Sequence, residues 1–393
     1  MSEFIYKSLC ILGRQPELGL AELESLYGYG SIRPLHGAAI LDVEAETINF
    51  KRLGGTVKVA RVLSVLPYSD WAQVHKYLVE KIPEHLQYMP EGKFTLGISL
   101  YGLSVDVQKL NQDVLKLKKV IKNSGRSVRI VPNKALELNS AQVLHNKLTH
   151  RGAWELLLLR NEEQTILAQT LFVQDIDDYA ARDQARPKRD ARVGMLPPKL
   201  AQIIINLCNP AAGSIVLDPF CGTGVILQEA VLMGYDAIGT DLETKMVEYS
   251  KENIAWLADK YGLRKKVSIE QADATNHKWA HDFDVVASEA YLGRPLARVP
   301  LPEELRDIIQ DVNTITKKFL NNLTLQLQAG QRLCVAVPAW KIGKNEFKQL
   351  PIIDHLTDMG YNYLDFKHVQ GNNLLYYRED QVVARQLLAL KRI

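Results

Sequence analysis

The feature that most constrains the fold is a regular alternation of apolar runs and helical stretches that begins at Pro198. Repeated β-α units with short connections build a parallel sheet with helices on both faces. The last two strands have no helix between them, so they are expected to form a hairpin with one antiparallel edge strand. The expected helices are 198–208, 225–234, 244–260, 302–328 and 345–359, and the expected strands are SIVLD, AIGTD, VSIEQAD, DVVASEA, RLCVAVP, YNYLDF and NNLLYYRE.

The first 173 residues mix strands and helices in a way typical of small α+β domains. Strand-like runs include FIYKSLCIL, AAILDVE, TVKVARVLSVL, FTLGISLYG, SVRIVPN, AWELLLLR and TILAQTLFV. Helical spacing is found in PELGLAELESLYG, WAQVHKYLVEKI, 107–123 and 142–151. Residues 174–198 are polar, charged and interrupted by prolines, and are interpreted as a linker.

Composition narrows the class of protein. A chain of 393 residues is too long for one typical core, and 47% hydrophobic with 24% charged residues is usual for a globular protein. The N-terminus lacks the long apolar run of a signal peptide, and no stretch has the roughly 20 apolar residues of a membrane helix. The four cysteines are scattered, which favours a reducing cytoplasm. With a net charge of only +3, any nucleic-acid surface must come from local clustering.

A glycine turn, LDPFCGTG, ends the first strand of the alternating region and indicates contact between backbone and ligand. A nicotinamide-binding turn would carry a third glycine, which is missing here. Instead, Asp218 closes the strand, and Asp241 closes the next strand where an acid can accept hydrogen bonds from a ribose diol. Asp273 and Ala274 close the third strand, where they can face an adenine amino group. Taken singly, Gly222 and Gly224 could be a plain strand-helix turn, Asp241 a helix cap and Asp273 a turn residue.

This ordered constellation resembles the S-adenosylmethionine-dependent methyltransferases of the seven-strand Rossmann-like class. In amino-methyltransferases of that class, the slot after the fourth strand reads [Asp/Asn]-Pro-Pro-[Tyr/Phe]. There an acceptor side chain holds the amine, and the aromatic ring stacks on the flipped base. This chain carries Ser288, Glu289, Ala290 and Tyr291 instead, so we expect Glu289 or Ser288 to be the acceptor and Tyr291 the stacking residue. An ordinary solvent-facing glutamate is the alternative.

Residues 179–242, with YAARDQARPKRDARVGMLPPKLAQIIINL joined to LDPFCGTG, resemble the Trm11-type, THUMP-containing tRNA guanosine-N2 methyltransferases. The resemblance implies a ferredoxin-like domain at 1–70, a THUMP-like RNA-binding domain at 71–173, a linker at 174–197 and a catalytic domain at 198–393. It also implies that the stretch from Arg192 to Pro198 borders the methionine end of the cofactor. The cofactor-binding residues are then Leu196, Pro197, Asp218, Phe220, Cys221, Gly222, Gly224, Asp241, Leu242, Asp273 and Ala274.

Basic residues gather where this resemblance places an RNA-binding domain. Such clustering is what phosphate contacts need, although a charged helix face is often merely solvated. The linker adds further arginines, which could hold a tRNA arm. The predicted RNA contacts are Lys116, Lys118, Lys119, Lys122, Arg126, Arg129, Arg182, Arg186, Lys188 and Arg189.

The sequence therefore predicts a cytoplasmic, S-adenosylmethionine-dependent tRNA methyltransferase that forms N2-methylguanosine, and the resemblance implies position 10 or the acceptor stem as the modified site. Two alternatives stay open: an adenine-N6 methyltransferase of DNA or RNA, and a non-catalytic RNA-binding protein whose methyltransferase fold survives. No metal site is expected, because His277 and His281 lack defined further ligands. Family relatives in eukaryotes use a small activator protein, and nothing in the sequence reveals one.

Overall fold

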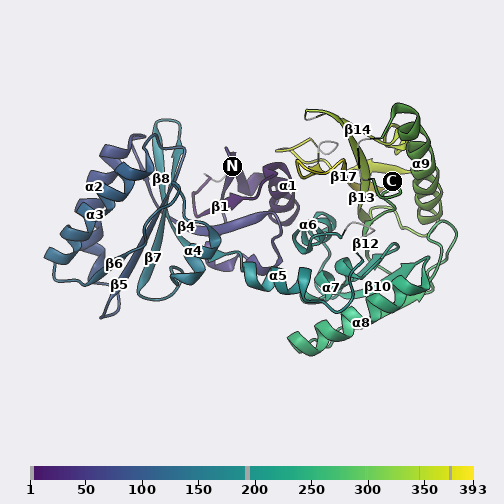
Figure 1. Ribbon diagram of the computed structural model, residues 1–393, viewed down its shortest axis with the longest axis horizontal. Helices are drawn as coiled ribbons and strands as arrows, with labels where there is room; N and C mark the ends of the chain where they lie inside the picture. The colour runs from purple at the N-terminus through teal and green to yellow at the C-terminus, as the bar shows by residue number, and fades with distance from the viewer. Residues whose placement is uncertain (1–3, 191–194, 297, 299, 345, 371–373) are drawn as a thin grey trace. The chain divides into compact units, whose positions relative to one another are not determined.

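The computed structural model describes residues 4–190, 195–296, 298, 300–344, 346–370 and 374–393. The chain forms two compact units (Figure 1). The first contains residues 1–13, 31–50 and 56–177, and the second contains 14–30, 51–55 and 178–393. Each unit is built on one sheet.

The first unit has an eight-stranded sheet, in which only the pairs β5–β6 and β5–β7 are parallel. Helices α2 (Trp71–Leu86) and α3 (Val107–Asn123) pack their apolar residues against β5, β7 and β8. A short helix, α4, spans Ser140–His145. In sheet order the strands are β2 (Ile32–Leu35), β3 (Ala38–Leu41), β1 (Ser8–Leu12), β4 (Thr56–Leu66), β8 (Gln164–Val173), β7 (Ala153–Asn161), β5 (Phe94–Tyr101) and β6 (Val128–Ile130).

This sheet runs through the predicted ferredoxin-like and THUMP-like regions without a break, because β4 and β8 pair along most of their length. Residues 14–30, which contain α1 (Pro16–Tyr27), group with the second unit instead. The predicted boundaries of the ferredoxin-like, THUMP-like and catalytic domains stay a prediction, since the two compact units divide the chain at other residues.

The second unit holds a nine-stranded sheet whose first five strands are parallel and whose long strand β17 is antiparallel. Two short strands, β14 (Glu346–Lys348) and β16 (Leu375–Tyr376), pair with β13 and β17. The main order is β11 (Val267–Gln271), β10 (Asp236–Asp241), β9 (Ile215–Asp218), β12 (Val285–Glu289), β13 (Arg332–Gly343), β17 (Val383–Arg392) and β15 (Tyr361–Tyr363).

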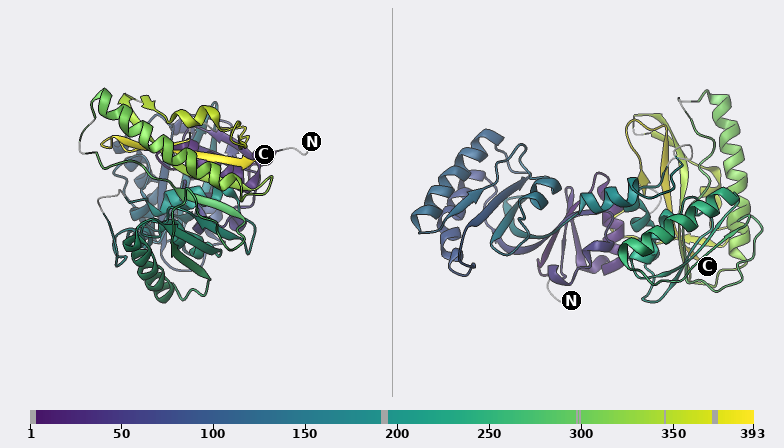
Figure 2. Two further views of the ribbon diagram at one scale, coloured as in Figure 1. Left: turned by 90° about the vertical axis from the view of Figure 1, so that its right-hand side faces the viewer. Right: turned by 60° about the horizontal axis from the view of Figure 1, so that its bottom comes forward.

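Helices cover both faces of this sheet, as repeated β-α units require. Helices α6 (Pro198–Cys208) and α7 (Val225–Leu232) share one core with the strands, and α9 (Pro302–Thr324) shares the other. Figure 2 shows α9 lying along its face. The remaining helices are α5 (Ile176–Gln184) and α8 (Thr244–Tyr261). The predicted α/β class is confirmed.

Two expectations at the level of elements are wrong. The predicted helix at 345–359 is replaced by β14 and a 3₁₀ turn at Pro351–His355, because Pro351 has no N–H for an α-helix interior. The prediction of a terminal hairpin lacks the strand β17, which lies between β13 and β15 in the sheet. The antiparallel strand is therefore internal and not at the edge. Helix α5 lies within the segment interpreted as a linker, and the linker itself stays a prediction.

Candidate functional site: the carboxyl edge of the second sheet

The glycine turn follows β9 and leads into α7. Gly222 and Gly224 have φ of +50° and +81°, a region that side chains other than glycine rarely adopt. A Cβ on Gly224 would lie 2.7 Å from the Ser250 hydroxyl, so packing alone demands glycine there. A Cβ on Gly222 would meet nothing within 4 Å, so this side of the turn is open for a ligand to approach the backbone.

Asp241 ties the end of β10 to this turn. Its Oδ2 accepts a hydrogen bond from the backbone N–H of Gly222 at 2.9 Å, and its Oδ1 accepts one from Glu243 at 3.0 Å. Burial raises the pKa of its carboxyl group. An ionised carboxylate has about four lone-pair positions, so both oxygens can still accept from a ribose diol. The structure thus brings Asp241 and Gly222 together in an arrangement that fits a nucleoside.

Two predicted site residues from different strands, Asp218 and Ser288, form a buried pair. The Ser288 hydroxyl donates to Asp218 Oδ1 at 2.6 Å, and both residues are almost fully buried. Burial raises the pKa of Asp218 to about 7, opposed by the bond from Ser288. The Ser288 hydroxyl is therefore directed at Asp218, which makes it a poor candidate to receive a substrate amine.

Glu289 ends β12 and forms an ion pair with Arg385 of β17. The Glu289 side chain is 16% exposed and that of Arg385 is 6% exposed, so the carboxylate is held in place but can still be reached. Burial raises the pKa of Glu289, and the Arg385 charge opposes this. Tyr291, two residues further, is 38% exposed. This edge thus carries a hydrogen-bond acceptor, the Glu289 carboxylate, and an aromatic ring two residues further along the chain.

Sequence reasoning missed Arg385, because the strand that carries it was not assigned. The available signal was one arginine within the apolar run VARQLLAL, where an unpaired charge would be costly.

Other predicted cofactor residues lie around the same edge. Asp273 Oδ1 accepts from the backbone N–H of Thr275 at 2.9 Å. Ala274 is buried, whereas Leu242 is 65% exposed. Phe220 packs edge-to-face on Phe319 with ring centroids 4.9 Å apart. Buried Cys221 donates its backbone N–H to Thr240, and burial raises the pKa of its thiol well above the ordinary value.

The stretch that precedes α6 is fastened to the glycine turn by Asn253, a residue that sequence reasoning missed. The Asn253 amide donates to the carbonyls of Lys188 at 3.0 Å and Thr223 at 2.8 Å, and its oxygen accepts from the Lys188 N–H. Leu196 is buried and Pro197 precedes the first residue of α6, whereas Arg192 lies outside the described residues.

The structure corrects two predicted RNA contacts. The Arg182 guanidinium is buried and forms ion pairs with Asp178 and with Glu229, the latter at 2.8 Å. Arg186 is also buried, at 3% exposure. Neither offers its charge to a polymer at the surface. Lys188 pairs with Glu252 at 3.3 Å, and Arg189 is exposed.

The basic face of α3 is only partly available to a phosphate. Lys116 and Lys109 both form ion pairs with the buried Asp113, at 2.8 and 3.2 Å. Lys119 and Lys122 are exposed, and Lys118 is half-buried. Arg129 is exposed but bonds to Asn146 at 2.9 Å, and Arg126 donates to the carbonyl of Pro90.

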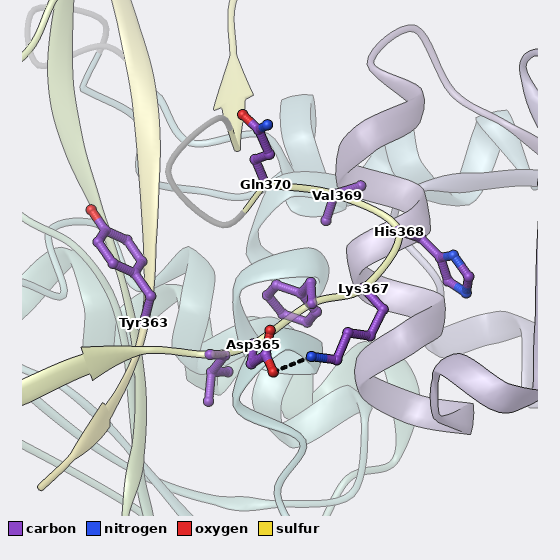
Figure 3. Close-up of a pocket in the computed structure, with 8 residues that line it drawn as sticks. Tyr363, Asp365, Lys367, His368, Val369 and Gln370 are labelled. Atoms are coloured by element: carbon purple, nitrogen blue, oxygen red, sulfur yellow. Dashed lines mark hydrogen bonds and ion pairs between the residues drawn. The ribbon is translucent and has the colours of Figure 1, made fainter.

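A pocket elsewhere in the second unit is lined by residues 363–370, in the loop after β15 (Figure 3). Asp365 pairs with Lys367, and His368 bonds to the carbonyl of Tyr29 at 3.0 Å. The pocket contains none of the predicted site residues.

Within the described ranges, no group of three or more His, Cys, Asp or Glu side chains could hold a metal ion. Of the helices that the structure describes, none has the length and apolarity to span a membrane.

The sheet order, the glycine turn and the acids at one edge define the Rossmann-like methyltransferase class. Residues 186–341 match the family described as UPF0020, RMKL-like methyltransferase domain. This chain therefore carries a methyltransferase domain. A DNA methylase family model also matches, over residues 111–252.

Curated relatives sharpen this assignment. The chain is 31% identical over 178 residues to the tRNA (guanine(10)-N2)-dimethyltransferase of Methanothermobacter thermautotrophicus, covering 45% of this chain and 48% of the relative. It is 34% identical over 124 residues to the enzyme of the same name from Methanocaldococcus jannaschii, covering 30% and 33%. The match thus spans half or less of these relatives' lengths. The predicted resemblance to the Trm11-type family is confirmed, because these relatives are tRNA guanine-N2 methyltransferases.

Solved structures agree on the fold. TrmN from Thermus thermophilus has a TM-score of 0.52 at 17% identity, covering 98% of this chain and 99% of that one. A predicted N6-adenine-specific DNA methylase from Listeria monocytogenes has a TM-score of 0.50 at 13% identity, covering 97% and 95%. At these identities the likeness concerns the fold alone.

Proposed function

We propose that this chain is an S-adenosylmethionine-dependent tRNA methyltransferase that forms N2-methylguanosine. The proposal rests on the groups found together at the carboxyl edge of the second sheet. Asp241 is hydrogen-bonded to the open glycine turn, and Glu289 and Tyr291 lie at and just after the end of β12. The names of the relatives support guanosine 10 as the first position to test.

The cofactor, when bound, supplies an electrophilic methyl group. Asp241 would accept from its ribose hydroxyls, Asp273 would face its adenine, and the N–H groups of the turn would contact its remaining part. The chain's own residues then orient the nucleophile. Glu289, fixed by Arg385, would accept hydrogen bonds from the exocyclic amine of guanine, and Tyr291 would stack on the base.

An amine of guanine is a weak nucleophile because its lone pair is conjugated with the ring. An acceptor that binds the amine hydrogens turns the lone pair toward the methyl group and takes up the proton afterwards. Glu289 suits this role better than Ser288, whose hydroxyl bonds to Asp218.

The tRNA would be held by Lys118, Lys119 and Lys122 of α3 and by Lys188 and Arg189, since phosphate contacts need clustered positive charge. We also propose a cytoplasmic location. An activator subunit remains a hypothesis to be tested by copurification.

Nucleoside mass spectrometry tests this function. Purified protein with S-adenosylmethionine and tRNA should yield N2-methylguanosine, and tRNA from a strain lacking the gene should lose it. Glu289→Gln protein is the matched control. N6-methyladenosine in the product would favour the adenine methyltransferase instead, an alternative supported by the DNA methylase match. Cofactor and tRNA binding without any product would favour the non-catalytic RNA-binding protein.

A further inference from the structure

Glu289 is held by an arginine that reaches it across a neighbouring strand. In the sheet, β13 lies between β12, which ends with Glu289, and β17, which carries Arg385. The register pairs Glu289 with Ala336 of β13 and Arg385 with Pro338. Neither β13 residue has a long side chain, so the two charged side chains can meet over the strand and form their ion pair.

This ion pair leaves part of the carboxylate available to a ligand. Among the described residues, the only hydrogen-bond donor to the Glu289 side chain is Arg385, whose Nε donates to Oε1. A carboxylate has about four lone-pair positions, so Oε2 and one position on Oε1 can still accept. Tyr291, 38% exposed, is the proposed stacking residue. A base that stacks there with its amine at Glu289 brings the neighbouring atom of its ring edge to the same carboxylate.

That neighbouring atom differs between the two candidate bases. Guanine carries hydrogens on both N1 and the 2-amino group, and both point outward from its Watson–Crick edge. Adenine has hydrogens on its 6-amino group, but its N1 is an acceptor. An ionised carboxylate can only accept, so it can bind both guanine donors side by side and opposes the N1 lone pair of adenine. A protonated carboxyl group offers one donor and one acceptor, which would suit adenine.

The protonation state of Glu289 therefore matters for base selection. Burial raises its pKa, which favours the protonated form, and the charge of Arg385 opposes this effect. The carboxyl group of Asp218, on β9, interacts unfavourably with the Glu289 carboxylate. Of the described residues whose charges act on Glu289, Arg385 is thus the one that favours the ionised form.

We propose that the pair of Glu289 and Arg385 selects guanine over adenine. Glu289 binds the N1 hydrogen of guanine together with the amine, and Arg385 is a positioning residue that holds Glu289 in its acceptor-only form. This inference rests on the proposed function and deepens it, since it names the chemistry by which the target base is chosen. A proline at this position, as in the motif of amino-methyltransferases, could offer only its backbone carbonyl to the base.

The test compares guanosine with 2-aminopurine at the position that the wild-type protein methylates in a synthetic tRNA. 2-Aminopurine keeps the 2-amino group, but its N1 is an acceptor as in adenine. In single-turnover rate, wild-type protein should prefer guanosine by about ten- to a hundredfold, the scale of losing a hydrogen bond to a charged group. Mass spectrometry of the methylated nucleosides measures both products.

The ratio of the two rates reports base selection, whereas either rate alone also reports catalysis. Glu289→Gln is nearly isosteric, and its amide offers one acceptor for the amine and one donor for the N1 of 2-aminopurine. Both rates should fall in this variant, but the preference for guanosine should fall as well, by about tenfold.

Variants of Arg385 test its part separately. Arg385→Met should lower the preference for guanosine, and more so at lower pH, because the buried carboxyl group of Glu289 then takes up a proton. Arg385→Lys keeps the charge and should recover part of the preference. The matched controls are Ser288→Ala and Arg392→Met, the second of which removes an arginine at the other end of β17. Both controls should keep the wild-type ratio.

Three results would overturn the inference while the proposed function stands. Equal wild-type rates on guanosine and 2-aminopurine would mean that N1 is not recognised. A wild-type ratio in Glu289→Gln would limit Glu289 to holding the amine. A wild-type ratio at every pH in Arg385→Met, folded by thermal melting, would remove Arg385 from base selection. If the wild-type protein methylated no guanosine in tRNA, the proposed function itself would fail, and this inference with it.

Discussion

At the scale of single residues, the contacts of Ser288 and Glu289 indicate which of the two could bind the substrate amine. Aligned without gaps, Ser288 occupies the usual acidic position, but its hydroxyl is fully buried and donates to Asp218. Glu289 instead retains some exposure and is oriented by Arg385. This geometry supports the proposal that Glu289, one residue further along the chain, is the acceptor.

Glu289→Gln should keep the fold and cofactor binding but lower turnover by roughly a hundredfold or more, the scale of losing a general base. Ser288→Ala should cost much less, because it removes a bond between buried groups and no contact with substrate. Single-turnover methylation of tRNA measures both variants, and calorimetry with S-adenosylhomocysteine serves as the binding control. The opposite ranking would place the chemistry at Ser288.

Asp218 gives a prediction about pH. Its pKa is about 4 in an unfolded chain, and burial raises it to about 7 in the fold, with a smaller contribution from the charges of Asp241 and Glu289 and against the hydrogen bond from Ser288. The folded protein therefore binds more protons between these values, and this group's contribution to stability is present below about pH 4 and is lost as the pH rises through about 7. Asp218→Asn should flatten the fall in melting temperature between pH 5 and 8. Ser288→Ala, which keeps the carboxyl group, should not. Parallel curves for wild type and Asp218→Asn would contradict the assignment.

Much of the site could be read from the sequence because strand-end acids and a glycine turn follow directly from chain order. Asp218, Gly222 and Asp241 could be placed together in this way. Arg385, Asn253 and the buried state of Arg182 could not, because each depends on a partner more than 20 residues away in sequence. Local patterns specify which elements form, whereas such partners depend on how those elements pack.

At the scale of elements, the same limit explains β17. Its run VARQLLALKR has neither strict alternation nor a clear helical period, since most of the strand is buried on both faces. Helix α3 was predicted with its observed bounds, because its apolar residues recur every three or four positions and Asp106 caps its start, accepting from Lys109 at 2.7 Å.

The exposed face of α3 gives the next prediction. Replacing Lys118, Lys119 and Lys122 with Gln should weaken tRNA binding and reduce its salt slope by up to about 0.9 per lost contact if the bound RNA is duplex-like. Lys109→Gln with Lys116→Gln is the matched control, because those lysines are engaged by Asp113. Filter binding at several salt concentrations measures the slopes, while S-adenosylhomocysteine affinity should not change. A wild-type slope in the triple variant would mean that this face is merely solvated.

At the scale of the whole molecule, the net charge of +3 on 393 residues cannot attract RNA by itself. The basic residues proposed to contact tRNA are divided between the two units, with the α3 lysines on the first and Lys188 with Arg189 on the second. A methyltransferase domain needs its target base at one sheet edge, so RNA contacts on a separate unit are useful only if one tRNA engages both.

The last prediction tests that joint engagement. One variant replaces Lys118, Lys119 and Lys122 with Gln, a second replaces Lys188 and Arg189, and a third combines all five changes. If one tRNA contacts both units, each set should weaken binding, and the two losses in binding free energy should add in the combined variant, as for separate sites. The salt slope should fall by the sum of the two separate reductions. Measured tRNA dissociation constants decide the matter. If the second set has no effect, or if the combined variant binds as the first one does, then the α3 lysines bind tRNA without help from Lys188 and Arg189.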